Sequence, residues 1–531
     1  MKLKELLAGL EILSANLDLE TEVSGVSYDS RTVRPGDLFV ALSGYTVDGH
    51  RFIPQALAAG AAAVLCQTPP EGEIPWVRVR DSRRALAVAG ANFFGHPAKA
   101  MTMVGITGTN GKTTTTYLLK AILEARGETV GLIGTNQNMI GQEILPTERT
   151  TPESFELQML LARMRDAGCT YVVMEVSSHA LVLDRVYGVP YKVGVFTNLT
   201  QDHLDFHQTM EAYCDAKAVL FRSCETGVVN AADPWTPRLL NGSTCKVITF
   251  SSGWGNGAGE GHASKPLGGK DCKENSVSST DDSRALKAKS PLPRSGNTCK
   301  GETLSGIGTA DLWSRDAVLE ADHVAFTAVC GGVQVPVRVN IPGRFTIDNA
   351  LDVLGAALAL GIPLEESAAV LARVPHVKGR VEVVPTPGKD YTVLIDYAHS
   401  PDSLENVLTT VKGFAKGRTI VLFGCGGDRD KSKRPKMGRV AAGAADLVIV
   451  TTDNPRTERP ADIIAGILPG LEGSGTPYEV VEDRVEAIHW AMDHARAGDV
   501  IVLCGKGHET YQEVGHEKRH MDEREIVAEY L

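Results

Sequence analysis

A glycine-rich segment, GTNGKTTTT at residues 108–116, has the residue types of a phosphate-binding loop. It follows an apolar stretch and precedes a predicted helix, so its backbone N–H groups and the helix N-terminus would point at one anion. Lys112 would reach the β- and γ-phosphates of a nucleotide, and Thr113 would bind Mg²⁺. The usual loop has four residues between its first glycine and the Gly-Lys pair, whereas Ile106 stands where that glycine is expected. The strand–loop–helix context still favours nucleotide binding over a structural glycine turn.

Potential metal ligands lie at the ends of the next two predicted strands. Glu175 is near the end of one strand, and TNLTQDHLDFH at 197–207 places Asp202, His203, Asp205 and His207 within six residues. Clustered imidazoles and carboxylates can bind a divalent metal. The structural alternatives are a buried ion-pair partner for Glu175 and a polar surface loop for 197–207.

A lysine lies between two aromatic residues on one face of a predicted helix, YCDAKAVLF at 213–221. Tyr213, Lys217 and Phe221 are spaced i, i+4 and i+8 along this segment. Such a lysine can simply extend its aliphatic stem over apolar surface. The residues alone therefore assign no role to Lys217.

Four polar loops follow predicted strands in the last third of the chain: DYAHSPDS (396–403), GCGGDRDKSKRP (424–435), TTDNPRTERP (451–460) and GKGHE (505–509). Asp396 could bond a ribose or cap the next helix. Arg429 and Arg456 could hold carboxylates, and Glu509 could hold an ammonium group. Each loop alone could be ordinary polar surface, but four at four strand ends of one domain indicate a small zwitterionic ligand. The sequence therefore predicts an ATP-using enzyme that acts on an amino acid.

The elements that would position these residues predict an α/β fold with three domains. Residues 1–98 form a small α/β domain that begins with an amphipathic helix in MKLKELLAGLEIL and ends near Pro97. Residues 99–341 contain apolar strands at 101–107, 171–177 and 193–199 that alternate with helices, which predicts a parallel, doubly wound sheet. Residues 342–531 repeat the pattern with strands at 392–398, 419–425, 447–453 and 500–507, which predicts a second, Rossmann-like domain. Ligands of such sheets bind at the carboxyl ends of the strands.

A segment rich in Ser, Gly, Lys and Pro at 251–307 interrupts the central domain. Its composition could not form a core, so we expect an exposed, disordered insertion, with regular structure resuming near Ala325.

Composition narrows the class of protein. The net charge of −11 argues against a generic nucleic-acid partner. Ten scattered cysteines without a CxxC pair fit a reducing compartment. The N-terminus does not read as a signal peptide and no apolar run is long enough to span a membrane, so we expect a cytoplasmic protein. The sequence does not determine the oligomeric state, for which a monomer is the working expectation.

The order of these motifs resembles the Mur ligases. The matching segments are GTNGKTT (108–114), EVSSH (175–179), TNLTQDHLDFH (197–207), DAK (215–217), DYAHSP (396–401), DNPR (453–456) and GKGHE (505–509). The resemblance covers nearly the whole chain apart from 251–307, and is greatest to the members that add meso-diaminopimelate to UDP-N-acetylmuramoyl-L-alanyl-D-glutamate. It implies a central ATPase domain, Mg²⁺ as cofactor, and an acyl-phosphate intermediate on the D-glutamyl carboxylate.

The resemblance also implies roles for individual residues. The implied catalytic residues are Lys112, Lys217, His203 and Glu175. Those implied for ATP are Gly108, Thr109, Asn110, Gly111, Lys112, Thr113, Thr114, Asn349, Arg380 and Asp396. Those implied for the UDP-linked substrate are Ser30, Thr150, Thr151, Ser177 and Arg185. Those implied for diaminopimelate are Arg429, Asp453, Asn454, Pro455, Arg456, Gly505 and Glu509. Those implied for metal are Thr113, Glu175, His203 and Lys217, the last as a carbamate. Arg149, Leu183 and Thr346 depart from the family pattern.

Two other interpretations stay open. A folylpolyglutamate synthase shares the ATP core, but lacks this kind of N-terminal domain and the DNPR set. A catalytically silent scaffold could keep the same side chains, and the 251–307 insertion hints at an added interaction role.

Overall fold

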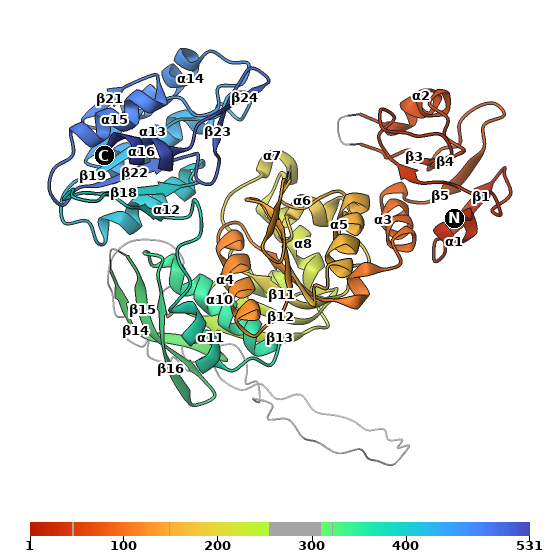
Figure 1. The fold of residues 1–531 in the computed structure, drawn as a ribbon, viewed down its shortest axis with the longest axis horizontal. Helices are drawn as coiled ribbons and strands as arrows, with labels where there is room; N and C mark the ends of the chain where they lie inside the picture. Colours follow the sequence, from red (N-terminus) through yellow and green to blue (C-terminus); the bar gives the residue numbers. More distant parts are fainter. Residues whose placement is uncertain (45–46, 148, 254–309, 321) are drawn as a thin grey trace, which may run out of the picture.

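The computed structural model describes residues 1–44, 47–147, 149–253, 310–320 and 322–531. The predicted insertion lies outside these residues except for its first three positions, and Ser251 still belongs to a strand. Three large sheets follow one another along the described part of the chain, and the N-terminal and C-terminal parts lie on opposite sides of the central one (Figure 1). The α/β class predicted from the sequence is confirmed.

The N-terminal part contains a five-stranded sheet in the order β1-β5-β4-β3-β2. Its elements are α1 (Leu3–Leu6), β1 (Ile12–Ala15), β2 (Val26–Ser27), β3 (Leu38–Val40), η1 (Gly49–Phe52), α2 (Ile53–Ala58), β4 (Ala63–Cys66), β5 (Trp76–Val79) and α3 (Ser82–Phe93). The long N-terminal helix predicted for MKLKELLAGLEIL is wrong, because α1 has only four residues and Ile12 already begins a strand. Gly9 has a φ of +86°, a left-handed conformation that ends the helix.

The central part contains an eleven-stranded sheet in the order β16-β15-β14-β13-β12-β11-β6-β10-β7-β8-β9. Its first elements are η2 (Pro97–Ala100), β6 (Thr102–Thr107), α4 (Lys112–Ala125), β7 (Val130–Ile133), β8 (Asn138–Ile140), β9 (Glu143–Leu145), α5 (Ser154–Asp166), β10 (Tyr171–Glu175), α6 (Ser178–Val182) and β11 (Tyr191–Phe196). They continue with α7 (Leu204–His207), α8 (Met210–Phe221), β12 (Cys224–Asn230), α9 (Thr236–Leu239), β13 (Lys246–Ser251), β14 (Leu312–Leu319), β15 (Val324–Cys330), β16 (Val333–Val339), α10 (Phe345–Ala359) and α11 (Leu364–Leu371).

The middle of this sheet is parallel, as predicted, but both edges are antiparallel. β8 and β9 extend one edge, and the β14–β15–β16 meander extends the other. Regular structure therefore resumes at Leu312, earlier than the predicted Ala325. Gly331 and Gly332, both at positive φ, form the tight turn between β15 and β16. A Gly-Gly pair between two apolar runs is the sequence signal for this hairpin.

Helices α10 and α11 pack into the core of the central sheet. Ile347 and Leu354 of α10 and Leu371 of α11 are buried in one cluster with Val104 of β6 and Leu118 of α4. The C-terminal sheet begins only at β17 (Glu382–Val384). We therefore propose that the change of domain lies in the linker 378–381 rather than at 341, where the sequence suggested it.

The C-terminal part contains a six-stranded sheet in the order β17-β18-β22-β19-β20-β21, parallel except for β17, and a separate β23–β24 hairpin. Its elements after β17 are β18 (Thr392–Asp396), α12 (Pro401–Lys412), β19 (Thr419–Phe423), α13 (Lys433–Ala444), β20 (Leu447–Val450), α14 (Pro460–Ile467), η3 (Leu468–Gly470), β21 (Tyr478–Val480), α15 (Arg484–Asp493), β22 (Val500–Cys504), β23 (Tyr511–Val514), β24 (Glu517–His520) and α16 (Glu523–Tyr530).

One buried carboxyl group in α10 makes a testable contribution to stability. Asp352 is 0% exposed, and neither of its oxygens has a hydrogen-bond partner among the described residues. Burial raises the pKa of Asp352 well above its usual value, and Asp348 one turn earlier raises it further. The folded state therefore holds a proton that the unfolded chain releases, so this group makes the protein less stable as pH rises above about 4.

We expect Asp352→Leu to raise the free energy of unfolding by about 1–3 kcal/mol at pH 8, because leucine keeps the branched shape of the side chain and removes an unpaired polar group. The gain should shrink toward pH 5, where the unfolded carboxyl group begins to bind its proton. Urea unfolding at both pH values measures this, with Asp352→Asn as the control that keeps the shape but cannot ionise. A lower stability of both variants at pH 8 would contradict the expectation.

Candidate active site

The phosphate loop is pressed between the segment after β11 and helix α10. Gly108 and Gly111 have φ values of +152° and +87°. A Cβ on Gly108 would lie 1.9 Å from Thr197 Oγ1, and one on Gly111 would lie 2.3 Å from Asn349 Oδ1. Both positions therefore require glycine, and Asn349, whose implied role in ATP binding stays a prediction, lies against the loop.

Backbone contacts hold this loop in place. The Thr109 N–H donates to the Asn198 carbonyl at 2.9 Å, and the Asn110 N–H donates to Asn198 Oδ1 at 3.0 Å. The loop leads directly into α4, which begins at Lys112, and Thr113 and Thr114 are buried in its first turn. The strand–loop–helix arrangement predicted from GTNGKTTTT is thus present, in spite of its unusual glycine spacing.

Lys112 and Lys217 meet at this loop from different helices. Lys112 Nζ donates to the carbonyls of Gly108 and Thr109 at 3.0 and 2.7 Å. Lys217 of α8 is 1% exposed, and its Nζ donates to the same Gly108 carbonyl at 2.9 Å. Burial, together with the nearby Lys112 charge, holds the pKa of Lys217 well below its usual value. This shift favours the neutral amine of Lys217, whose Nζ is 4.4 Å from the centre of the Tyr213 ring.

Glu175 lies at the end of β10 and is 1% exposed. Its Oε1 accepts hydrogen bonds from Thr113 Oγ1 and from the Thr135 N–H, both at 2.9 Å. Its Oε2 accepts from Thr135 Oγ1 at 3.0 Å. Thr135 is not among the residues predicted from the sequence, although it follows the end of β7 by two residues and so shows the same signal as the other strand-end residues.

His203 lies beside this group. It precedes α7 with a φ of +53°, and its ring centre is 6.1 Å from that of Tyr213 and 5.0 Å from that of His179. Within the described residues, no three His, Cys, Asp or Glu side chains are grouped as a metal site. The predicted ligand set is Glu175, His203 and Lys217, so it contains only two side chains of these four types. Lys217 would become a metal ligand only after its amine reacts with CO₂ to form a carbamate.

The residues implied for the UDP-linked substrate are next to Glu175, except for Ser30. Thr150 Oγ1 lies 3.0 Å from Thr135 Oγ1, and Thr151 Oγ1 donates to the Glu175 carbonyl at 2.9 Å. Ser177 caps α6, and Arg185 pairs with Glu153 at 3.2 Å. Ser30 lies in the N-terminal domain, where its hydroxyl donates to Gln55 Oε1 at 3.0 Å.

The N-terminal part contacts the central part near Glu153 and Glu156, at the start of α5. The Tyr28 hydroxyl donates to Glu156 Oε1 at 2.6 Å, and Arg83 Nη1 lies 3.6 Å from Glu153 Oε2. Glu153 therefore joins Arg185 to the N-terminal domain. This places the predicted UDP-binding domain next to the residues implied for the peptide part of the substrate.

Arg380 reaches the start of α4 from the linker, and Asp396 at the end of β18 contacts the linker. Arg380 Nη2 donates to Thr113 Oγ1 at 3.1 Å, and Asp396 Oδ2 accepts from the Val381 N–H at 2.8 Å. Burial raises the pKa of Asp396. The alternative that Asp396 caps the following helix is wrong, because Ser400 is the residue that caps α12.

The DNPR and GKGHE segments face each other at adjoining loops of the C-terminal domain. Asn454 Nδ2 donates to Glu509 Oε2 at 2.9 Å. A Cβ on Gly505, which has a φ of +110°, would lie 2.3 Å from Asp453 Oδ2. Lys506 is not among the site residues predicted from the sequence. It is 0% exposed and donates to Glu509 Oε2 at 2.6 Å. Glu509 therefore already pairs with Lys506 of its own segment. Lys506 could have been noticed from the sequence, because it lies inside the GKGHE motif.

Two arginines border the same region. Arg456 has a φ of +50°, pairs with Glu513 at 2.9 Å, and donates to the Gly427 carbonyl at 2.8 Å. A Cβ on Gly427 would lie 1.9 Å from the Pro455 carbonyl, so the DNPR segment packs tightly on this glycine turn. Arg429 is exposed on the same turn, which leaves its guanidinium available to a ligand.

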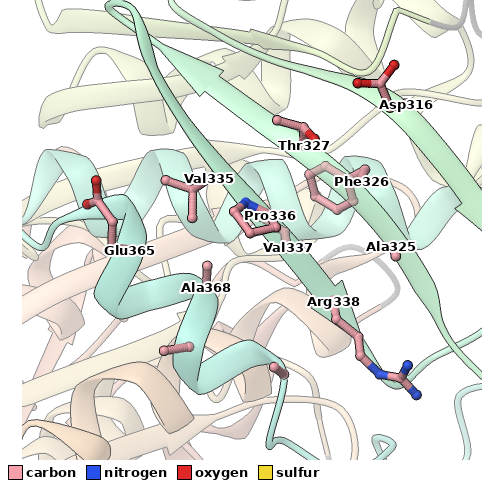
Figure 2. Close-up of a pocket in the computed structure, with 12 residues that line it drawn as sticks. Asp316, Ala325, Phe326, Thr327, Val335, Pro336, Val337, Arg338, Glu365 and Ala368 are labelled. Carbon is pink, nitrogen blue, oxygen red and sulfur yellow. The ribbon is translucent and has the colours of Figure 1, made fainter.

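A separate cavity lies far from these residues in the fold. It has a volume of about 620 Å³ and lies between β15, β16 and α11, with a largely apolar wall that includes Phe326, Val337 and Ala368 (Figure 2). None of the residues predicted from the sequence lines it.

Comparison with known families matches three segments of the chain. Residues 22–96 match the Mur ligase family, catalytic domain; 106–298 match the Mur ligase middle domain; and 379–507 match the Mur ligase, glutamate ligase domain. A UDP-N-acetylmuramoyl-L-alanyl-D-glutamate–2,6-diaminopimelate ligase from Clostridium botulinum is 41% identical over 516 residues, covering 96% of this chain and 95% of its own. The chain belongs to the Mur ligase family.

Other relatives agree over the full length. The ligase of the same description from Caldanaerobacter subterraneus subsp. tengcongensis is 42% identical, covering 100% of this chain and 99% of its own. A solved structure of such a ligase has a TM-score of 0.66 at 28% identity, covering 100% of this chain and 98% of its own. A MurF ligase from Thermotoga maritima in complex with ADP shares the fold, with a TM-score of 0.57 at 18% identity, covering 96% of this chain and 97% of its own. Across the described part of this Mur ligase, no helix combines the length and apolar character needed to cross a membrane.

Proposed function

We propose that this protein is the ATP-dependent ligase that joins meso-2,6-diaminopimelate to the D-glutamyl residue of UDP-N-acetylmuramoyl-L-alanyl-D-glutamate. The observation that supports the substrate assignment is the contact of DNPR with GKGHE at the strand ends of the C-terminal domain, where Asn454 donates to Glu509 and Arg456 of the same segment donates to the Gly427 carbonyl. Relatives about 40% identical over the whole chain carry this activity in their names. Since the reaction uses ATP and a UDP-linked peptidoglycan precursor, we infer a cytoplasmic enzyme, and we keep a monomer as the expectation.

The chemistry transfers the γ-phosphoryl group of ATP to the side-chain carboxylate of the D-glutamyl residue and releases ADP. The amine of diaminopimelate then attacks the acyl phosphate, so that an amide bond forms and inorganic phosphate leaves. Two anions must approach each other in the first step. The backbone N–H groups of 108–111 and the ammonium group of Lys112 would neutralise the phosphate oxygens.

Thr150, Thr151, Ser177 and Arg185 would hold the peptide part of the substrate near Glu175. Thr151 donates to the Glu175 carbonyl and accepts from the Ser177 N–H, Thr150 contacts Thr135, and Arg185 donates to the Thr151 carbonyl at 3.3 Å. The acyl phosphate must be protected from water. Arg380, which already reaches Thr113 from the linker, would help to close the C-terminal domain on the central one.

Mg²⁺ fits the donor set that the site presents. Thr113, Glu175, His203 and Lys217 as a carbamate would supply oxygen and nitrogen ligands, and the bound ion would neutralise charge on the phosphates and the substrate carboxylate. Carbamate formation requires a neutral amine to attack CO₂, and the burial of Lys217 beside Lys112 shifts its pKa in the direction that favours the neutral form.

A panel of amino acids tests the assignment. Phosphate release is measured with ATP and the UDP-dipeptide substrate, and we expect meso-diaminopimelate to exceed lysine by a large factor. Faster release with lysine would overturn the choice of amino acid. ATP binding without any amino-acid-dependent release would instead favour the silent scaffold.

Arg456→Ala is expected to raise the KM for diaminopimelate by about 10- to 100-fold, because a charged hydrogen bond contributes about 1.5–3 kcal/mol. The KM for ATP should change little. Arg519→Ala is the matched control, since Arg519 forms only a surface contact with Glu517 in the same domain. An equal rise of both KM values in Arg456→Ala would contradict a role in amino-acid binding.

A further inference from the structure

A small charged network joins the C-terminal helix, the GKGHE loop and the linker between the domains. Arg524 of α16 donates from Nη2 to the Gly507 carbonyl at 3.0 Å. Its Nε donates to Glu382 Oε1 at 2.8 Å, and Nη2 also contacts Glu382 Oε2. Glu382 Oε2 in turn accepts from the Gly379 N–H at 2.6 Å. Neither Arg524 nor Glu382 belongs to the residues that the family resemblance assigned to ligands.

The linker touches the GKGHE loop directly at Gly379. This residue has a φ of +71°, and a Cβ there would lie 2.3 Å from the His508 nitrogen and 2.4 Å from the Gly507 carbonyl carbon. The two backbones are therefore in contact with no side chain between them. A displacement of Gly507 must be accompanied by a displacement of Gly379.

The next residue along the linker reaches the phosphate site. Arg380 donates to Thr113 Oγ1 at 3.1 Å, and its Cζ is 5.2 Å from the centre of the Tyr397 ring. The Tyr397 ring centre is 4.8 Å from that of His508, which is again in GKGHE. On its other side the linker is held by Asn136 of the central domain, whose Nδ2 donates to the Lys378 carbonyl at 3.0 Å.

The charged side chains of Glu382 and Arg524 are largely shielded from solvent. The side chains of Glu382 and Arg524 are 9% and 18% exposed. Although burial raises the pKa of Glu382, hydrogen bonds from His376, Arg524 and the Gly379 N–H outweigh burial and lower it to about 2. The carboxylate is thus charged at every pH at which the enzyme would be assayed, and its hydrogen bonds are of the charge-assisted kind.

We propose that Glu382 and Arg524 are positioning residues that couple the amino-acid loop GKGHE to the placement of Arg380 at the phosphate site. The proposal rests on the proposed function, since GKGHE is there assigned to diaminopimelate and Arg380 to closure of the C-terminal domain on the phosphate site. Neither Glu382 nor Arg524 touches a ligand in this scheme. Their effect is to make binding in the C-terminal domain and the position of Arg380 in the central site depend on each other.

The test uses Glu382→Gln, which keeps the shape and removes the charge, and Arg524→Met in the full-length enzyme. We expect both variants to raise the KM for diaminopimelate and the KM for ATP together, by about fivefold or more each. The double variant should be no worse than the more impaired single variant, because the two residues act through one contact. Arg524→Lys, which keeps the charge, should recover part of the loss.

Several results would overturn the proposal while leaving the proposed function intact. The first such result is that the wild-type enzyme releases phosphate with diaminopimelate, but Glu382→Gln changes only one of the two KM values or neither of them. Another is a lowered Tm and active fraction with unchanged KM values, which indicates a purely structural ion pair. A wild-type enzyme inactive with diaminopimelate would instead refute the proposed function. Should Arg524→Met fail to fold, Glu382→Gln and Arg524→Lys still decide between these results.

Discussion

Replacing Lys217 by methionine is expected to lower kcat by about 1,000-fold or more, with a much smaller effect on the KM for diaminopimelate. Methionine keeps the unbranched chain as far as the ε position but has no amine, so it cannot form a carbamate. A metal ligand that stabilises transition-state charge contributes several kcal/mol, and each 1.36 kcal/mol corresponds to a factor of ten in rate. Steady-state phosphate release measures the change.

Lys120→Met is the matched control for this variant. Lys120 is also a buried lysine on a helix of the central domain, but it pairs with Glu124 at 2.6 Å, away from the phosphate loop. We further expect wild-type activity to fall when CO₂ is removed and to return with bicarbonate, and ¹³CO₂ should give a carbamate signal in NMR spectra. A Lys217→Met enzyme that keeps a tenth or more of its kcat would rule out the carbamate as a required ligand.

Replacing Lys112 by methionine is expected to lower kcat/KM for ATP by about 100- to 1,000-fold, because removing one preorganised donor to a developing charge has this effect. Lys112 Nζ now donates to two loop carbonyls, at 3.0 and 2.7 Å. It needs only a side-chain rotation to reach a phosphate bound at the same loop.

Lys112→Met differs from Lys217→Met in its effect on nucleotide binding. Lys112→Met should weaken binding of a non-hydrolysable ATP analogue in calorimetry, whereas Lys217→Met should leave that binding nearly unchanged. Lys99→Met, an exposed lysine just before β6, controls for the change in net charge. Unaltered analogue binding by Lys112→Met would show that Lys112 has another role.

Local signals were sufficient to predict much of the fold. Short apolar runs such as 101–107 and 419–425, each followed by Gly or polar residues, were predicted as buried strands and form strands in the structure. Polar residues follow such runs at Thr107 and Glu175, which are strand ends in the structure as well. Parallel strands bring their carboxyl ends to one edge, so side chains distant in sequence meet there.

Long-range packing decided what local signals missed. Helices α10 and α11 have the periodicity of any amphipathic helix, and nothing local shows that they cover the central rather than the C-terminal sheet. The pairing of Lys506 with Glu509, and of Arg524 with Glu382, likewise depends on which loops adjoin. Thr135 joins Glu175 only because β7 is placed beside β10.

The sequence by itself determined the α/β class, the phosphate loop from Gly108 to Thr113, and the family to which the chain belongs, because each depends on residue types at short and fixed spacing. Tertiary structure alone decided that Lys112 and Lys217 share the Gly108 carbonyl and that the amine of Lys217 is buried. It also decided that the linker at Gly379 joins the two candidate ligand sites. The physical reason is that the charge state of a lysine and the contact of two backbones depend on neighbours that the chain brings together only when it folds.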